Sequence, residues 1–204
     1  MKRNSEQQTV FVVEDDEAMR DSIRWLLESE NIETRMYASA GDFLKGCDFD
    51  LHGCLLLDVR MPEMSGMELL EVLRSKGFQL PVIMITGHGD VPMAVRAIKL
   101  GAFNFIQKPF ASQELLDQIQ LAFAKDRESR QKAGLAEQRR AYLASLTDRQ
   151  MQVMELVAAG DSSKAIAMKL GISPKTVDIH RATIMRKLGV KSVAEIVQLR
   201  LSLH

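Results

Sequence analysis

Cysteine is nearly absent from this chain, which contains only Cys47 and Cys54 among its 204 residues. Two cysteines are too few for the disulfide framework of a small secreted protein, and neither belongs to a CxxC pair or a Cys/His cluster that would bind zinc. No run of eighteen apolar residues is present, so a transmembrane helix is not expected. The opening residues MKRNSEQQ also lack the apolar core of a signal peptide. These absences predict a protein of the reducing cytoplasm that does not insert into a membrane.

The chain also has no excess of charge of either sign, because 27 basic residues balance 27 acidic ones. The two signs are nevertheless separated along the chain. Residues 1–124 hold 19 acidic and 12 basic side chains, residues 125–143 hold 3 and 6, and residues 144–204 hold 5 and 9. An acidic first part and a basic last part predict a cation site followed by a surface for a polyanion. Two ordinary domains of different charge would give the same count.

Short apolar runs alternate with amphipathic stretches from residue 9 to about residue 124. The runs predicted as strands are TVFVV, IETRMY, GCLLL, LPVIMIT and FNFIQ. The stretches with helical spacing of their apolar residues are MRDSIRWLLES, GMELLEVLRS, PMAVRAIKLG and QELLDQIQLAFA. This alternation predicts an α/β fold with a parallel sheet and helices on both faces. In such sheets, ligands bind beyond the carboxyl ends of the strands.

A highly charged segment without proline, residues 125–143, follows the last of these helices. It is predicted to be either a helical extension or a flexible linker, and Gly134 is the residue in it that least favours a helix. Residues 144–204 then show four short helical patterns. Thr147 and Gln150 form a T-x-x-Q capping box at the start of the first. The last part of the chain is therefore predicted to be an all-α domain.

Acidic side chains stand where two of the predicted strands end. Glu14, Asp15 and Asp16 follow the first strand, and Asp58 ends the third within GCLLLDVRMPEMSG. If these strands are neighbours, the carboxylates converge at one edge of the sheet and repel one another unless a cation lies among them. A set of oxygen ligands without histidine predicts Mg²⁺. A carboxylate in this position is either a satisfied structural group or a reactive one.

A hydroxyl group and an ammonium group complete the pattern. Thr86 ends the fourth predicted strand, and Lys108 with Pro109 follows the fifth. Taken singly, each residue has an ordinary explanation as a strand threonine or a solvated lysine. Carboxylates, a hydroxyl and an ammonium at four strand ends of one sheet can together bind a metal ion and a phosphoryl group.

Four segments, VVEDD, LLLDVRMPEMSG, MITGHGDVPMAVRAIKLGA and FIQKPF, resemble the receiver domain of two-component response regulators over about residues 8–124. The run GHGDVPMAV further resembles the FixJ subgroup. The resemblance implies a flavodoxin-like, doubly wound, five-stranded parallel sheet, which we assign to residues 1–124. It also implies a sensor histidine kinase as the partner that phosphorylates the chain.

The same resemblance assigns the acidic residues. Asp58 would accept the phosphoryl group and Asp15 would be the direct ligand of Mg²⁺. Glu14, which stands where an aspartate is more usual, would act through water. Asp58 and the backbone carbonyl of Arg60 would complete the protein's share of the metal ligands.

The remaining receiver residues are assigned in the same way. Thr86 and Lys108 would bind the phosphoryl oxygens, and Phe105 would be the aromatic side chain that moves during switching. Arg60 and His88, two residues after Asp58 and Thr86 respectively, occupy positions that tune the lifetime of the acyl phosphate.

The residues after position 144 form a helix-turn-helix pattern. A short helix, a turn containing Gly171 and a helix opened by Ser173 and Pro174 succeed one another. LTDRQMQVMELVAAGDSSKAIAMKLGISPKTVDIHRATIMRKLGVKS resembles the four-helix domain of the LuxR/NarL type, over residues 144–204, with its recognition helix at about 174–188. The DNA-binding residues implied are Thr176, Asp178, Ile179 and Ala182 facing bases, Lys164, Lys175 and Arg181 facing phosphates, and also His180 and Arg186.

Three other functions share part of this pattern. A four-helix segment can also be a bundle that binds another protein, with its charges merely solvated. Phosphatases of the haloacid dehalogenase type carry a second acid two residues after the nucleophile, where this chain has Arg60. A DNA-binding protein with a decayed receiver would not keep Asp15, Asp58, Thr86 and Lys108 together. We therefore predict a cytoplasmic transcription regulator rather than an enzyme, which dimerises on phosphorylation, binds promoter DNA and contacts RNA polymerase.

Overall fold

The computed structural model describes residues 8–46, 51–87, 91–192 and 194–197. The chain divides into two compact units, Met1–Arg130 and Gln131–His204. Within the described ranges, no helix is both long enough and apolar enough to cross a membrane.

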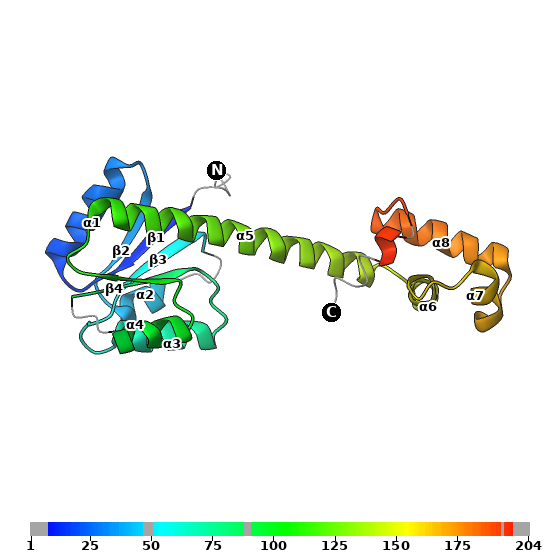
Figure 1. The fold of residues 1–204 in the computed structure, drawn as a ribbon, viewed down its shortest axis with the longest axis horizontal. Coiled ribbons are helices and arrows are strands. Elements are labelled where there is room, and N and C mark those ends of the chain that lie inside the picture. Colours follow the sequence, from blue (N-terminus) through cyan, green and yellow to red (C-terminus); the bar gives the residue numbers. More distant parts are fainter. Residues whose placement is uncertain (1–7, 47–50, 88–90, 193, 198–204) are drawn as a thin grey trace. The chain divides into compact units, whose positions relative to one another are not determined.

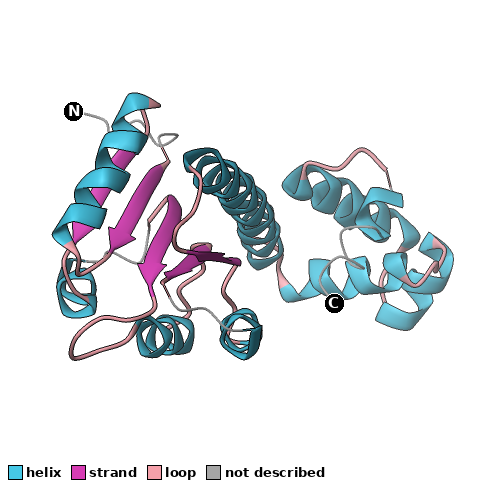
Figure 2. Ribbon diagram, turned by 60° about the vertical axis from the view of Figure 1, so that its left-hand side comes forward, coloured by secondary structure: helices cyan, strands magenta, loops and turns pink. Residues whose placement is uncertain are grey.

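Five parallel strands form the centre of the first unit (Figures 1 and 2). They are β1 (Thr9–Val13), β2 (Glu33–Tyr37), β3 (Gly53–Asp58), β4 (Val82–Thr86) and β5 (Asn104–Gln107). Their order across the sheet is β2-β1-β3-β4-β5. This is the order of a flavodoxin-like doubly wound sheet, so the predicted fold class is confirmed.

Helices cover both faces of the sheet, because successive strand residues point to opposite sides and the three inner strands β1, β3 and β4 are buried along their whole length. The helices are α1 (Glu17–Ser29), α2 (Ala40–Gly46), α3 (Gly66–Ser75), α4 (Val91–Lys99) and the first part of α5 (Ser112–Ala144), which continues beyond this unit. Phe11, Leu55 and Met84 pack in one cluster with α2, α3 and α4. Val12 and Leu56 pack in the other with α1 and α5. Figure 1 shows the two layers of helices on opposite sides of the strands.

Helix α5 continues without a break through Gly134 to Ala144. Near its middle, the buried carboxylate of Asp126 accepts a hydrogen bond from the backbone N–H of Gly53 at 3.0 Å and one from Arg130 Nε at 3.1 Å. Arg130 also donates to the carbonyl of Leu51. Gly53 has φ +127°, and a Cβ at this position would lie 1.9 Å from the carbonyl oxygen of Thr9. The amino end of β3 is therefore fastened to α5 at a point that only glycine can occupy.

The second unit contains α6 (Asp148–Ala158), α7 (Ser163–Leu170) and α8 (Pro174–Leu188), followed by helical residues at 194–197. The predicted capping box of Thr147 and Gln150 is present at the start of α6. Gly171 joins α7 to α8 in a left-handed conformation with φ +66°. Residue 193 and the rest of the predicted fourth helix, 198–201, lie outside the described residues. A core shared by the three helices is formed by Val153, Met154, Val157, Ile166, Ala167, Val177, Ile184 and Leu188.

Candidate functional site

Four residues predicted for one site lie at the carboxyl ends of four adjacent strands. Glu14 follows β1, Asp58 ends β3, Thr86 ends β4 and Lys108 follows β5, and these strands are neighbours in the sheet. The backbone N–H of Lys108 donates to the carbonyl of Thr86 at 2.7 Å, which extends the pairing of β4 and β5 by one step. The hydrogen bonding of the sheet itself therefore places the lysine beside the other strand ends.

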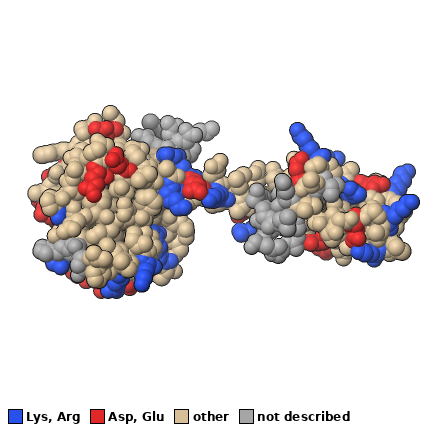
Figure 3. Space-filling model, in the orientation of Figure 1, with Lys and Arg blue, Asp and Glu red and all other residues tan. Residues whose placement is uncertain are grey.

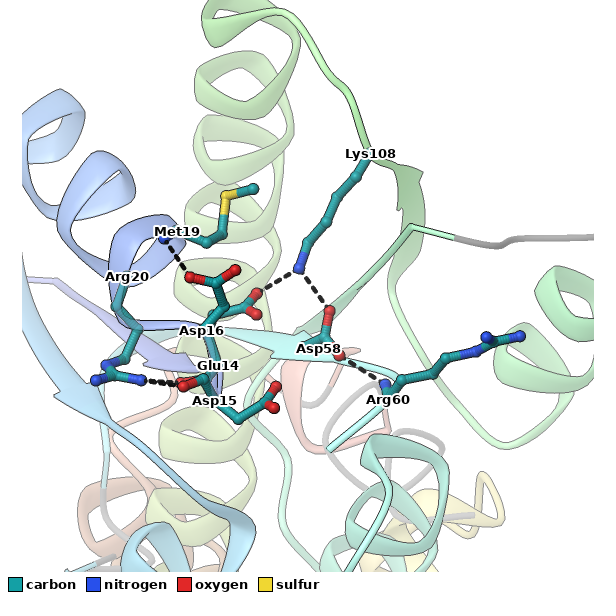
Figure 4. Close-up of polar contacts among 8 residues, drawn as sticks. All are labelled: Glu14, Asp15, Asp16, Met19, Arg20, Asp58, Arg60 and Lys108. Atoms are coloured by element: carbon teal, nitrogen blue, oxygen red, sulfur yellow. Dashed lines mark hydrogen bonds and ion pairs between the residues drawn. The ribbon is translucent and has the colours of Figure 1, made fainter. Parts of the chain in front are cut away.

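The ammonium group of Lys108 joins the two buried carboxylates of the site (Figure 4). Its Nζ lies 2.6 Å from Glu14 Oε2 and 2.7 Å from Asp58 Oδ1. The Glu14 and Asp58 side chains are only 3% and 6% exposed, so their charges depend on this partner for stabilisation. The second oxygen of Asp58 accepts a hydrogen bond from the backbone N–H of Arg60 at 2.6 Å. Both oxygens of Asp58 are thus held in place.

The electrostatics of this cluster favour protonated Lys108 and disfavour ionised Glu14. Burial raises the pKa of Glu14 above its ordinary value, and the hydrogen bond from Lys108 offsets only part of this effect. Burial alone would lower the pKa of Lys108, but its hydrogen bonds to Asp58 and Glu14 outweigh that effect and raise the pKa. Ionised Glu14 is therefore the costly member of the cluster.

Asp15 adds a third carboxylate, exposed to solvent. One oxygen from each of Glu14, Asp15 and Asp58 lies within 4.8 Å of the others. Three carboxylates beside one ammonium leave an excess of negative charge, and hard divalent cations prefer oxygen ligands of this type. The donor set therefore fits a metal ion, as predicted from the acidic residues at the strand ends.

Asp16 in the β1–α1 turn and Arg20 in α1 have structural roles. The side chain of Asp16 accepts a hydrogen bond from the backbone N–H of Met19 at 3.2 Å and so caps α1. Arg20 donates to the carbonyl oxygens of Glu14 and Asp15 at 2.8 and 2.7 Å. These contacts, drawn in Figure 4, fix the backbone that carries the two acidic ligands.

The loop after Asp58 folds back against the end of β3. The backbone N–H of Gly66 donates to the carbonyl of Val59 at 3.0 Å, and Ser65 and Glu68 form a capping box for α3. A Cβ at Gly66 would lie 2.0 Å from the carbonyl oxygen of Asp58. Gly66 therefore lets α3 begin directly beside the aspartate. It was not among the predicted site residues, although the glycine that closes MPEMSG was its signal in the sequence.

The other predicted receiver residues occupy different environments. Thr86 is fully buried, whereas Phe105 is partly buried against the core cluster that includes α4. The Arg60 side chain is exposed and points away from Asp58 in Figure 4. His88 lies outside the described residues.

The residues predicted to contact DNA lie on α7 and α8. Lys175, Asp178, Ile179, Ala182 and Arg186 are exposed on α8, as is Lys164 on α7, whereas Thr176, His180 and Arg181 are partly buried. On the face drawn in Figure 3, Lys and Arg side chains of the second unit are dispersed among acidic ones.

Asp178 and Arg181 form hydrogen bonds within the protein. The hydroxyl of Ser163 donates to Asp178 Oδ1 at 2.8 Å, and Arg181 Nη1 donates to the same hydroxyl at 2.8 Å. Ser163 was not singled out from the sequence.

Comparison with known families assigns both units. Residues 10–120 match the family model of the response regulator receiver domain. The chain belongs to the response regulators. Residues 144–200 of this response regulator match the family of bacterial regulatory proteins called the luxR family. The predicted family is therefore confirmed for both parts of the chain.

This response regulator is similar over nearly its whole length to named regulators. It is 45% identical to the transcriptional regulatory protein TdiR of Thauera aromatica over 188 residues, which cover 92% of this chain and 83% of TdiR. It is 40% identical to the transcriptional regulatory protein FixJ of Bradyrhizobium diazoefficiens, with 93% of each chain covered. Among solved structures, the response regulator StyR matches with a TM-score of 0.90 and 44% identity, covering 96% of this chain and 99% of StyR.

These findings establish the chain as a two-component response regulator that acts as a transcription factor. The relatives are named regulators of transcription, not enzymes. The receiver domain implies a sensor kinase as a partner, and the luxR-type domain implies binding to DNA.

Proposed function

We propose that Asp58 accepts a phosphoryl group from a sensor histidine kinase and that this event controls binding of the second unit to promoter DNA. The observation that carries the proposal is the contact of Lys108 with Asp58 at 2.7 Å, at the solvent-facing end of a buried strand. An ammonium group at this place stabilises the negative charge of a phosphoryl group as it is transferred. The hydrogen bond from the Arg60 backbone orients the other carboxylate oxygen.

Magnesium is the metal that best fits the three carboxylates. Asp15 would bind it directly and Glu14 through water, with Asp58 and the backbone carbonyl of Arg60 completing the protein's ligands. When bound, Mg²⁺ neutralises charge on the phosphoryl oxygens. The raised pKa of Glu14 supports this assignment, because a nearby cation relieves the cost of ionising a buried carboxyl.

Asp58 attacks phosphorus in line, and its Oδ–P bond replaces the bond to the kinase histidine. Lys108 then transfers its hydrogen bonds to the phosphoryl oxygens, and the Thr86 hydroxyl turns towards them. Phe105 moves into the space that Thr86 leaves, which alters the surface of α4 and β5. Arg60 and His88 govern how fast water reaches the acyl phosphate.

The output is a dimer on DNA. A charge added at Asp58 can act on another unit only by biasing an element with two arrangements, and the surface of α4 and β5 is that element. Two receivers that pair through it would raise the effective concentration of the linked DNA-binding domains on an operator with two half-sites. We assign residues 1–124 to the receiver, 125–143 to a helical linker and 144–204 to the DNA-binding domain, which also contacts RNA polymerase in the cytoplasm.

The phosphorylation step is tested by incubating the full chain with Mg²⁺ and phosphoramidate and following acyl-phosphate formation by mass spectrometry. Wild type should gain one phosphoryl group and Asp58→Asn none. Asp15→Ala should lose Mg²⁺-dependent phosphorylation, whereas Asp16→Asn, which keeps the cap of α1, should retain it. Equal phosphorylation of the Asp15 and Asp16 variants would refute the metal assignment.

The output step is tested in the same samples. The mass in solution and the affinity for a duplex selected by the wild type are measured with and without phosphoramidate. Dimer formation and tighter DNA binding should appear together and only in proteins that carry the acyl phosphate. A gain in affinity by a protein that stays monomeric, both free and on DNA, would instead support release of an inhibitory domain contact.

A further inference from the structure

The Ser163 hydroxyl links the two helices of the helix-turn-helix. It donates to Asp178 Oδ1 at 2.8 Å and accepts a hydrogen bond from Arg181 Nη1 at 2.8 Å. A hydroxyl offers one donor and two acceptor sites, so it serves both partners at once. The carboxylate and the guanidinium, both predicted to face DNA, are thereby joined through a residue of α7.

This contact lies at the opposite end of α7 from the turn. Ser163 is the first residue of α7, and Gly171 follows its last residue, Leu170. At 1.5 Å per residue, the two ends of α7 are about 10 Å apart. The Gly171 turn fixes one end of α7 against α8, and the Ser163 contact fixes the other. Two fixed points determine the direction of one helix relative to the other.

The apolar contacts between the helices limit this direction only to a range, because helix packing leaves a scatter of about 15–20° in the crossing angle. Ile166 and Ala167 of α7 pack against Val177 and Ile184 of α8 in the common core. Hydrogen bonds weaken steeply when their angles change, so the contacts of Ser163 narrow this range.

We infer that Ser163, Asp178 and Arg181 form a lock that sets the angle of α8 in the DNA major groove, with Asp178 acting as a positioning residue and not as a reader of bases. The inference rests on the proposed contact of α8 with DNA. It reassigns Asp178, because the hydrogen bond from Ser163 ties one carboxylate oxygen, Oδ1, to α7 and fixes the direction in which the side chain points. It also gives Arg181 a role in orientation in addition to any contact with phosphate.

The test uses the full chain and a pool of DNA duplexes with a randomised central segment, from which the wild type enriches its preferred sequence. Ser163→Ala and Asp178→Ala should each weaken binding to that duplex by about threefold to tenfold, the range for one lost hydrogen bond. Both variants should enrich the same bases as the wild type. The double variant should bind no more weakly than the weaker single variant, because both changes open the same lock.

Two further variants separate the lock from a general loss of structure. Ser163→Thr keeps the hydroxyl and should restore wild-type affinity. Lys164→Ala removes the neighbouring exposed ammonium group. The loss of affinity that it causes should add to the loss caused by Ser163→Ala, and the salt dependence of binding should fall.

Two results would overturn the inference, and a third would overturn the proposed function on which it rests. Enrichment of a different base at one position by Asp178→Ala, with Ser163→Ala unchanged, would make Asp178 a reader. Additive losses in the double variant would show that the two residues act independently. A wild type that enriches no sequence from the pool would refute the proposed reading of DNA itself, which distinguishes that failure from failure of the lock.

Discussion

Replacing Lys108 with methionine should destabilise the receiver unit in a way that depends on pH. The substitution removes the ammonium group that lies 2.6 Å from Glu14 and 2.7 Å from Asp58. At an effective dielectric constant of about 20, two unit charges at this separation attract by about 6 kcal/mol. The loss is smaller than the sum of two such attractions, because the variant no longer desolvates an ammonium group and Asp58 keeps its hydrogen bond from Arg60.

Protonation of Glu14 sets an upper limit on its share of this cost. At pH 7 a carboxyl group with the ordinary pKa of 4.5 can be neutralised for about 3.4 kcal/mol, and at pH 5 for about 0.7 kcal/mol. Lys108→Met should therefore lower the free energy of unfolding by about 3 kcal/mol at pH 7 and by about 1 kcal/mol at pH 5.

Proton linkage determines how the loss of stability in Lys108→Met changes with pH. The folded-state pKa of Glu14 is raised already, and loss of the hydrogen bond from Lys108 raises it further. A group whose folded pKa is raised contributes stability below its unfolded pKa and loses that contribution as the pH rises through the folded pKa. The difference between variant and wild type should therefore grow from pH 5 to pH 7, and added Mg²⁺ should recover part of it.

The assay is urea denaturation followed by the fluorescence of Trp25, the single tryptophan, which lies in α1 of the receiver unit. Lys125→Met is the matched control, because Lys125 forms an exposed ion pair with Glu128 at 3.7 Å. Exposed pairs contribute about 0 to 1 kcal/mol. Equal effects of the two substitutions at pH 7, or a loss at Lys108 that is independent of pH, would refute the assigned electrostatics.

Three further predictions follow from single contacts. Glu14→Gln should raise the urea midpoint at pH 7.5 and leave it nearly unchanged at pH 4.5, because only the ionised carboxylate is costly where burial raises its pKa. Gly66→Ala should cost about 1–3 kcal/mol in the same assay and slow acyl-phosphate formation, since its Cβ would lie 2.0 Å from the Asp58 carbonyl oxygen. Thr147→Ala should lower the stability of the second unit by about 1 kcal/mol in thermal circular dichroism without moving the Trp25 transition, because it removes the cap that bonds the Gln150 N–H.

Much of the receiver could be predicted because its signals are local. Each buried strand is a short apolar run, and polar residues mark where four of these runs end, so Glu14, Asp58, Thr86 and Lys108 follow from strand boundaries and parallel pairing. Helix α2 was missed because its seven residues include two glycines and span fewer than two turns, too short for a clear helical periodicity.

Contacts between distant positions could not be predicted. Asp126 and Gly53 are 73 residues apart, and Ser163 and Asp178 are 15 residues apart on different helices. Nothing in the local pattern around Asp126 distinguishes it from the exposed acids of a charged helix. Its burial depends on where α5 crosses the sheet, which is set by tertiary packing.

The hydrogen bond from Gly53 in β3 to Asp126 in α5 makes the receiver's folding unit longer than its apolar pattern indicates. A chain cut after residue 124, where the apolar pattern stops, would lose Asp126 and leave the buried N–H of Gly53 without its acceptor. A buried donor without a partner costs about 1–3 kcal/mol, a large fraction of the stability of a domain of this size. The loss would fall on the central strand that carries Asp58 at its other end. The segment needed for folding thus reaches Arg130, six residues into the part of the chain whose composition is that of a linker.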